Sequence, residues 1–343
     1  MTVESKGSRI VAKQVVWREN SPDKCETPSV RISFRREGII GSGSSFGVVQ
    51  TVNITKIFSS AGDTRVPENG LKLAMKTLSV KRRESRELNI LKETNHLNIV
   101  KLRFYFYTHA KDTRELKLNL LFDIHQTSLF HLIEKLSNEE SRMSSSDILN
   151  YGQQILQGLE YLHNKSIAHR DLKPRNLLVD EENRFLQICD LGSACRVGEG
   201  LDLNPYICSR FYRAPELLLG STDYNSQVDI WSVGCVLGEM ALLHPLIPGQ
   251  DTGDQIGEVM DLLGAPTETD LVEMGLQHPG LYYTVGALTD RIQDFGREDR
   301  IHKLLNPVLG FYPWISSTLQ SILQYNPSSR PTPSQLLAII SSS

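Results

Sequence analysis

The chain has 343 residues, a formal net charge of −3 at pH 7, 40% hydrophobic residues and 22% charged residues. These fractions are ordinary for a globular protein and exclude the disordered and fibrous classes. The near-neutral charge lacks the basic footprint of a nucleic-acid binder, so nucleic acid is not an expected partner.

The number and spacing of the cysteines indicate the redox environment in which the protein works. The five cysteines are odd in number and form no CxxC pair, so neither a disulfide framework nor a zinc site is predicted. Reduced thiols fit the cytosol or the nucleus. The first 30 residues contain no signal-peptide core, and no apolar stretch approaches the ~18 residues that a membrane span needs. We therefore expect a soluble intracellular protein without a membrane partner.

The first part of the chain changes character near residue 34. Residues 1–34 mix charges with Ser, Pro and Lys without a sustained period, which predicts an N-terminal extension rather than a domain. From Ser33 onward, alternation through "GIIGSGSSFGVVQTVNI" predicts two strands around a glycine-rich turn. The segment "FSSAGDTRVPENG" that follows predicts an exposed loop because of its Gly, Pro, Asn and Asp content.

The next segments predict a small sheet with one helix. "LKLAMKTL" (71–78) alternates like a strand, and "SRELNILKETN" (85–95) places its leucines on one face of a helix. "IVKLRFYFYTH" (99–109) and "ELKLNLLFDI" (115–124) predict two more strands. Together these segments indicate a strand-rich first lobe.

From Ser128 onward the pattern is mainly helical. Residues 144–164 carry a serine and aspartate start signal before apolar residues at helical spacing. Residues 228–243 are apolar on nearly every side, which predicts a buried helix. The expected fold class is α+β: a small antiparallel β-lobe with one helix (35–124) and a larger, mainly α-helical lobe (125–343).

One short stretch, "IAHRDLKPRNLLVD" (167–180), concentrates charged and amide side chains before an aliphatic run. Leu177, Leu178 and Val179 predict a short buried strand, so the polar residues belong to a loop that this strand holds in place. The spacing of these polar residues would not place them on one face of a strand or on one face of a helix. A loop that wraps around a phosphate and its metal ion would explain this spacing.

The polar motifs occur in an order that resembles the protein kinase family over roughly residues 38–337. Single motifs are weak signals, but the complete series is specific. In chain order they are the turn with Gly41, Gly43 and Gly47, the strand ending at Lys76, the helix with Glu87, the loop with Asp171, Lys173 and Asn176, the "CDLGS" segment with Asp190, and "RAPE" ending at Glu216.

The resemblance implies roles for the first group of motifs. The three glycines would let backbone N–H groups approach the phosphates of ATP, since no Cβ stands in the way. Lys76 would contact the α and β phosphates, and Glu87 would hold Lys76 through an ion pair. A charge inside the apolar strand of Lys76 is costly unless it is paired, which favours this role over that of an ordinary surface charge.

The later motifs would carry the chemistry. By the resemblance, Asp190 and Asn176 would bind Mg²⁺, and Asp171 would accept the proton of the substrate hydroxyl. Lys173 would neutralise charge on the transferred γ-phosphoryl group. The lysine two residues after the aspartate, in "DLKP", is similar to the serine/threonine class of kinases.

The resemblance also implies an adenine site along "LLFDIH". Phe122 would be the gatekeeper, and the backbone of Asp123 and His125 would meet the adenine edge. The residues that would line the site are Val49, Ala74, Leu178 and Cys189, although each is also an ordinary core residue type.

Within the family, "YICSRFYRAPE" and "LIPGQDTGDQIGEVMDLLGAPT" resemble the glycogen synthase kinase 3 subfamily of the CMGC group. This implies that Tyr206 is an autophosphorylated activation-loop tyrosine, whose alternative role is to cover a hydrophobic patch. It also implies protein substrates already phosphorylated four residues downstream. Arg86 and Arg170 match two of the three basic residues that would bind this priming phosphate.

The third basic position falls on Cys195, which supplies no positive charge at neutral pH unless its pKa is depressed. Arg196 could replace it if its side chain turns inward, since a guanidinium suits phosphate. The glycine-rich turn has one residue more than GxGxxG, so we expect it to bulge. Scaffold proteins could dock on the C-lobe, although "VEMGLQHPGLYYTVGAL" diverges from the subfamily pattern.

Two alternatives remain beside an active kinase of this type. The first is a pseudokinase scaffold, or a weakly active kinase that has lost its priming specificity, suggested by Cys195 and the lengthened turn. Retention of Lys76, Asp171, Asn176 and Asp190 argues against it. The second is a cyclin-dependent-like branch that needs an activating subunit, which "YICSR" disfavours.

Overall fold

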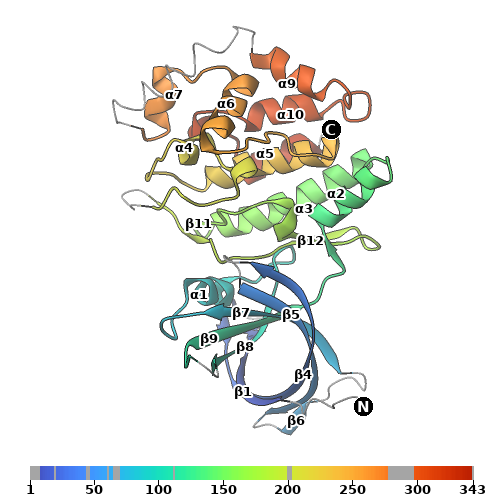
Figure 1. The fold of residues 1–343 in the computed structure, drawn as a ribbon, viewed down its shortest axis with the longest axis vertical. Helices are drawn as coiled ribbons and strands as arrows, with labels where there is room; N and C mark the ends of the chain where they lie inside the picture. Colours follow the sequence, from blue (N-terminus) through green and yellow to red (C-terminus); the bar gives the residue numbers. More distant parts are fainter. Residues whose placement is uncertain are drawn as a thin grey trace. The chain divides into compact units, whose positions relative to one another are not determined.

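The chain folds as two compact units, which Figure 1 shows as a ribbon. Unit 1 comprises Met1–His125 and Asp190–Gly192, and unit 2 comprises Gln126–Cys189 and Ser193–Ser343. The computed structural model describes residues 8–18, 21–43, 47–59, 62–64, 70–110, 113–198, 203–276 and 297–341. Each unit is described by itself.

Unit 1 is built from antiparallel strands and one helix, α1. Its main sheet has the order β4-β1-β8-β9-β7-β5-β6, and β4 also pairs with β5. The elements are β1 (Ser8–Gln14), β2 (Val16–Arg18), β3 (Ser21–Glu26), β4 (Ser29–Gly43), β5 (Gly47–Ser59), β6 (Gly62–Thr64), β7 (Leu71–Ser79), α1 (Arg86–Glu93), β8 (Leu102–His109) and β9 (Leu116–Asp123).

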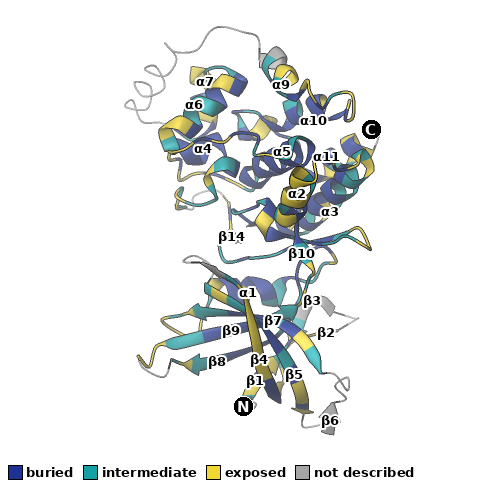
Figure 2. Cartoon of the chain, turned by 45° about the vertical axis from the view of Figure 1, so that its right-hand side comes forward, coloured by how far each residue is buried: buried dark blue, intermediate teal, exposed yellow. Residues whose placement is uncertain are grey.

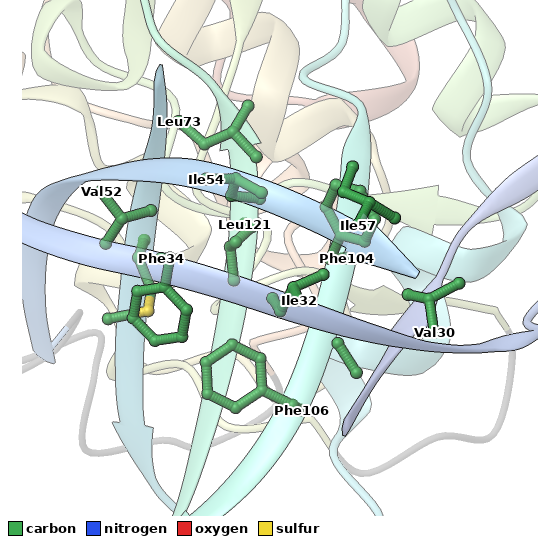
Figure 3. Packing of buried hydrophobic residues seen from close by; sticks show 12 residues of the cluster. Val30, Ile32, Phe34, Val52, Ile54, Ile57, Leu73, Phe104, Phe106 and Leu121 are labelled. Carbon is green, nitrogen blue, oxygen red and sulfur yellow. The ribbon is translucent and has the colours of Figure 1, made fainter. Parts of the chain in front are cut away.

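The core of unit 1 lies on one face of this sheet, as Figure 3 shows. Strand side chains alternate between faces, so the apolar residues at every second position of β4, β5 and β7 gather together. Burial of this apolar surface is the main stabilising contribution to the unit. The cluster comprises Ala12, Val30, Ile32, Phe34, Val52, Ile54, Ile57, Leu73, Met75, Phe104, Phe106 and Leu121.

The segment of residues 1–34 contains strands that the sequence pattern does not predict. Strand β1 pairs with both β4 and β8, and Ala12 enters the core while its neighbour Val11 is 63% exposed. An apolar residue on the solvent side removes the alternation between apolar and polar residues by which a strand is recognised. Pairing with β4 and β8 therefore forms β1 despite its weak pattern.

The predicted strands and helix of unit 1 are confirmed with small shifts at their ends. The strand predicted at 71–78 is β7, those at 99–109 and 115–124 are β8 and β9, and the helix at 85–95 is α1. The Ser85 hydroxyl accepts from the backbone N–H of Leu88 at 3.5 Å, the usual arrangement of an N-cap serine. Helix α1 therefore begins at Arg86.

Gly47 occupies a position that other residues would fit poorly. Its φ is +74°, and a Cβ placed on it would lie 2.2 Å from the backbone oxygen of Thr77. We expect Gly47→Ala to lower the free energy of unfolding by about 2 kcal/mol, because both the backbone angle and the contact become strained. Chemical denaturation measures this loss. Gly38→Ala, with nothing within 4 Å of its Cβ position, is the control, and equal effects of the two substitutions would contradict the prediction.

Unit 2 is mainly helical. Its short strands are β10 (Thr127–Ser128), β11 (Ile167–Ala168), β12 (Leu177–Asp180), β13 (Phe185–Ile188) and β14 (Cys195–Arg196), with 3₁₀ turns at Pro174–Asn176, Arg210–Tyr212 and Pro327–Ser329. The helices are α2 (Leu129–Asn138), α3 (Ser145–His163), α4 (Pro215–Leu218), α5 (Gln227–Leu242), α6 (Thr252–Leu263), α7 (Glu268–Glu273), α9 (Arg297–Leu305), α10 (Ile315–Ile322) and α11 (Pro333–Ser341).

Helix α5 forms the centre of unit 2, and both helices predicted there are confirmed. Every residue from Val228 to Ala241 is buried, and α5 is accordingly dark blue in Figure 2. Helices α3 and α10 pack against α5, and α11 packs against α3. An apolar sequence on all sides of a helix requires neighbours on all sides, which these helices supply.

Glu239, on α5, is buried at 3% exposure and accepts a hydrogen bond from the Tyr212 hydroxyl at 2.7 Å. Burial raises the pKa of Glu239 from 4.5 to about 7, although the Tyr212 bond and Arg175 oppose the shift. Below pH 4.5 the carboxyl is protonated in both the folded and the unfolded state. Between pH 4.5 and 7 only the unfolded state loses the proton, so stability falls as the pH rises.

We therefore expect the free energy of unfolding of Glu239→Gln to rise above that of the wild type as the pH increases from 4.5 to 7. The difference should reach on the order of 3 kcal/mol at pH 7 and stay constant at higher pH. Denaturation curves at several pH values measure this difference. Glu182→Gln, at an exposed position, is the control. A pH-independent difference between Glu239→Gln and the wild type would disprove the prediction.

Some expectations from the sequence lie outside the described residues. They are the bulge of the glycine-rich turn at 44–46, residues 60–61 and 65–69 of the predicted loop, and most of the divergent segment at 272–288. Most of the described part of that loop is strand instead, because Phe58 and Ser59 end β5 and pair with β6. The pairing of β4 with β5 does shift between Ile39 and Gly41, just before the turn. No helix within the described ranges is long and apolar enough to cross a membrane.

Candidate active site

Strand β7 places Lys76 on the face of the sheet opposite to the core of unit 1. Leu73 and Met75 enter the core, so Ala74 and Lys76 point to the other face. Val49 on β5 pairs with Lys76, and Phe122 on β9 pairs with Ala74. Since paired residues share a face, these four residues line one surface of the sheet.

Lys76 is held by two carboxylates. Its Nζ atom lies 2.7 Å from Glu87 Oε1 and 2.7 Å from Asp190 Oδ1, and Lys76 and Glu87 are each 6% exposed. Burial opposes the positive charge, but the two carboxylates outweigh it and raise the pKa of Lys76. The lysine is therefore a fixed positive charge on this surface.

The other residues expected around adenine are distributed over both units. In unit 1, Phe122 and Asp123 end β9 and His125 follows two residues later, with its buried Nδ1 atom unbonded among the described residues. In unit 2, Leu178 lies on β12, and the backbone N–H of Cys189 donates to the Asn176 carbonyl at 2.9 Å.

The loop before β12 gathers the polar side chains of unit 2 around Asp171. Lys173 Nζ lies 2.8 Å from Asp171 Oδ2, and Asn176 Nδ2 donates to the Asp171 carbonyl at 2.7 Å. The 3₁₀ turn Pro174–Asn176 brings Asn176 back towards Asp171. The three residues singled out in the sequence are thus brought together in one loop.

Ser209 is a site residue that the sequence analysis missed. Its backbone N–H and its hydroxyl both donate to Asp171 Oδ1 at 3.0 Å, and its hydroxyl accepts from Lys173 Nζ at 2.7 Å. Ser209 is 38 residues away from Asp171 in the sequence, within "YICSR". A lone serine in a loop gives no local signal of this contact, so only the motif itself could have drawn attention to it.

The loop is anchored by Asp229 of α5, which is fully buried. Its carboxylate accepts from the backbone N–H groups of His169 and Arg170 at 2.8 Å and contacts His163 Nε2 at 2.9 Å. Burial alone would raise the pKa of Asp229, but these interactions hold it below its ordinary value. The charged carboxylate therefore fixes the backbone just before Asp171.

The basic residues expected to bind a priming phosphate are placed as follows. In unit 1, Arg86 begins α1 and donates to the Gly192 carbonyl at 3.3 Å. In unit 2, Arg170 is buried and donates to the Ser193 carbonyl at 2.8 Å and to the Tyr224 hydroxyl at 2.6 Å.

Cys195 and Arg196 lie on the two-residue strand β14, and their side chains point to opposite faces. The Cys195 thiol is buried with Ala168 and Val197, whereas Arg196 is exposed and donates to the Lys165 carbonyl at 2.8 Å. The structure therefore does not bring the Arg196 guanidinium to the position of the Cys195 side chain.

Tyr206 is exposed at 80%, and the guanidinium of Arg213 lies 5.1 Å from the centre of its ring. The backbone N–H of Tyr206 donates to the Asn204 side chain at 2.9 Å. The hydroxyl of such an exposed ring is accessible to modification.

The expected metal ligands have suitable chemistry. Asp190 offers a carboxylate, and Asn176 offers an amide oxygen because its amide nitrogen already donates to Asp171. Mg²⁺ prefers oxygen ligands and completes its shell with water and phosphate oxygens. Each of the two residues therefore has the ligand chemistry that Mg²⁺ requires.

The match to a family model defines the class of the protein. Residues 34–339 match the protein kinase domain. The chain belongs to the protein kinase family, with its two-lobed α+β fold and its use of ATP.

Within this family the chain is a member of the glycogen synthase kinase 3-like branch of the CMGC group. It is 37% identical over 281 residues to the serine/threonine-protein kinase RIM11/MSD1 of Saccharomyces cerevisiae, a match that covers 80% of this chain and 72% of the relative. It is 38% identical over 259 residues to the protein kinase gsk3 of Schizosaccharomyces pombe, covering 76% of this chain and 64% of that relative.

Proposed function

We propose that this protein kinase transfers the γ-phosphoryl group of Mg-ATP to serine and threonine hydroxyls of protein substrates. The observation that carries the proposal is the orientation of the Asp171 carboxylate, which Asn176, Lys173 and Ser209 hold by direct bonds. A base fixed in this way can accept the proton of a substrate hydroxyl. The names of the relatives favour an active kinase over the pseudokinase alternative.

Each polar side chain has a proposed role in the reaction. Lys76 binds the α and β phosphates, and Lys173 stabilises charge on the group being transferred. Asp190 and Asn176 hold Mg²⁺, which supplies neutralisation of the phosphate charge when it is bound. Val49, Ala74 and Leu178 enclose the adenine ring, Phe122 is the gatekeeper, and Cys189 lines the same site. The backbone of Asp123 and His125 meets the adenine edge, and Gly41, Gly43 and Gly47 let the backbone approach the phosphates.

We further propose a regulatory role for α1. Glu87 is on this helix, so any movement of α1 would break the bond of 2.7 Å between Glu87 and Lys76. Without that bond a single carboxylate, Asp190, would hold the lysine. The position of α1 would then set the activity of the enzyme.

We propose that the preferred substrates carry a phosphate downstream of the acceptor, and that Arg86 and Arg170 bind it. Arg196 would contribute only after its side chain leaves the Lys165 carbonyl. We also propose that the kinase phosphorylates its own Tyr206 and that scaffold proteins dock on its C-lobe. We place the protein in the cytosol or the nucleus. The five free thiols support a reducing compartment.

Phosphate transfer from Mg-ATP to two matched peptides tests the proposal. One peptide carries a phosphoserine four residues after the acceptor serine, and the other carries serine there. We expect the phosphorylated peptide to react faster, and we expect Arg86→Gln to reduce this preference about tenfold by removing a charge-assisted hydrogen bond. Arg82→Gln, an exposed arginine on the segment before α1, is the control.

The possible outcomes distinguish the proposed priming specificity from the proposed kinase activity. Equal rates on both peptides would leave a serine kinase without priming specificity. Transfer no faster than that of Asp171→Asn on either peptide would contradict the catalytic proposal itself.

A further inference from the structure

A groove of about 450 Å³ runs along unit 2 next to the catalytic loop. Lys173 and Ser209, which both contact the Asp171 carboxylate, form part of its wall. Phe130 of α2 and Glu239 of α5 form other parts. A peptide with its acceptor serine at Asp171 would therefore place neighbouring side chains in this groove, if the proposed function holds.

Arg175 lines the groove and is held in a defined position. Its guanidinium carbon lies 3.4 Å from the centre of the Phe130 ring, so the planar group stacks on the aromatic face. The side chain is exposed and makes no hydrogen bond to the described part of the chain. Stacking occupies only the face of a guanidinium, so its N–H edge remains able to donate.

The other charged groups of the groove are already engaged. Lys173 is bonded to Asp171, and Glu134 lies 3.3 Å from the His131 ring nitrogen. Glu239 is buried, accepts from Tyr212 and interacts electrostatically with Arg175, although no hydrogen bond joins the two side chains. Burial also raises the pKa of Glu239 to about 7, which removes part of its negative charge near neutral pH. Arg175 is thus the lining cation best placed to bind a new partner.

We propose that Arg175 is a specificity-determining residue that binds an acidic side chain, aspartate or glutamate, of the substrate peptide within a few residues of the acceptor serine. A carboxylate accepts two parallel hydrogen bonds from a guanidinium edge. Because Phe130 already orders the arginine, little conformational entropy is lost on binding. This position is separate from the priming residues, since Arg170 contacts Ser193 and Tyr224 instead.

A peptide scan tests this inference. Peptides carry Asp, Ala or Lys in turn at each position within four residues of the acceptor serine, and kcat/KM is measured for each with Mg-ATP. Fluorescence anisotropy measures the binding of the same peptides to the enzyme without turnover. At one position we expect Asp to exceed Ala about fivefold in the wild type. Arg175→Gln should abolish this ratio, and Arg175→Glu should favour Lys at that position.

Arg142→Gln is the matched control, because Arg142 stacks on Phe311 at 4.7 Å but does not line the groove. Its ratios should equal those of the wild type. An Asp preference that survives in Arg175→Gln, or the absence of any Asp preference in the wild type, would overturn the inference. Absence of phosphate transfer to every peptide would instead refute the proposed function, and the anisotropy measurements would still decide the role of Arg175.

Discussion

Asp171→Asn is expected to lower kcat by about 10²- to 10⁴-fold, the usual contribution of a positioned general base. Asparagine has nearly the same shape, and its oxygen can still accept from Ser209. Its NH2 group replaces the oxygen that accepts from Lys173 and Asn176, so those two bonds are lost. The amide cannot accept the proton of the substrate hydroxyl. Steady-state rates on a phosphorylated serine peptide measure the loss, and the KM for ATP should change little because Lys76, not Asp171, binds the nucleotide in the proposed mechanism.

The control for this substitution is Asp180→Asn at the end of β12. Asp180 accepts from the backbone N–H of Asn183 at 3.1 Å in the turn that follows. We expect a kcat within about twofold of the wild type, since no step of phosphoryl transfer involves this turn. If Asp171→Asn retained the wild-type kcat, Asp171 would not be the base.

Arg330→Met is expected to lower the free energy of unfolding of unit 2 by about 3–5 kcal/mol. Arg330 is 3% exposed and Glu216 is 1% exposed, and two N–H groups of the arginine donate to the two oxygens of Glu216 at 2.7 Å each. Arg330 also donates to the carbonyls of Gln324, Gln227 and Tyr325. Removing it leaves a buried carboxylate and several carbonyls without their partner.

Two further variants make this prediction specific. The double variant Arg330→Met with Glu216→Gln should recover part of the loss, because the unpaired charge is gone. Arg184→Met breaks the exposed bridge to Asp147, where the two side chains are 50% and 29% exposed, and should cost about 1 kcal/mol or less. Calorimetry or chemical denaturation measures all three. Equal losses for Arg330→Met and Arg184→Met would show that the buried pair is unimportant.

Local sequence pattern predicted the longer strands and the helix of unit 1 and two long helices of unit 2. The helices α1, α3 and α5 and the strands β7, β8 and β9 lie within a few residues of their predicted ranges, because each has a clear apolar period or start signal. Strand β1 was missed because its outer residue Val11 is apolar. Its formation depends on pairing with β4 and β8, which a local pattern does not contain.

The order of the motifs identified the candidate site residues, and the structure shows how several of them meet. A lysine inside an apolar strand must find a negative partner, and Lys76 has two, Glu87 and Asp190. The sequence separation of Lys76 and Asp190 is 114 residues, so no local rule predicts their contact. The kinase resemblance supplied Glu87, whereas the direct bond to Asp190 was found only in the structure.

The sequence by itself determined the fold class, the order of the elements and the residue types that phosphoryl transfer requires, because these depend on local periodicity and on a linear series of motifs. Apart from the Lys76–Glu87 pair, which the kinase resemblance implied, the tertiary structure decided which of these side chains meet. It placed Ser209 on Asp171, turned Arg196 away from the Cys195 face and stacked Arg175 on Phe130. The physical reason is that strand faces and loop contacts arise from pairings between distant residues, and packing energies fix those pairings only in the folded chain.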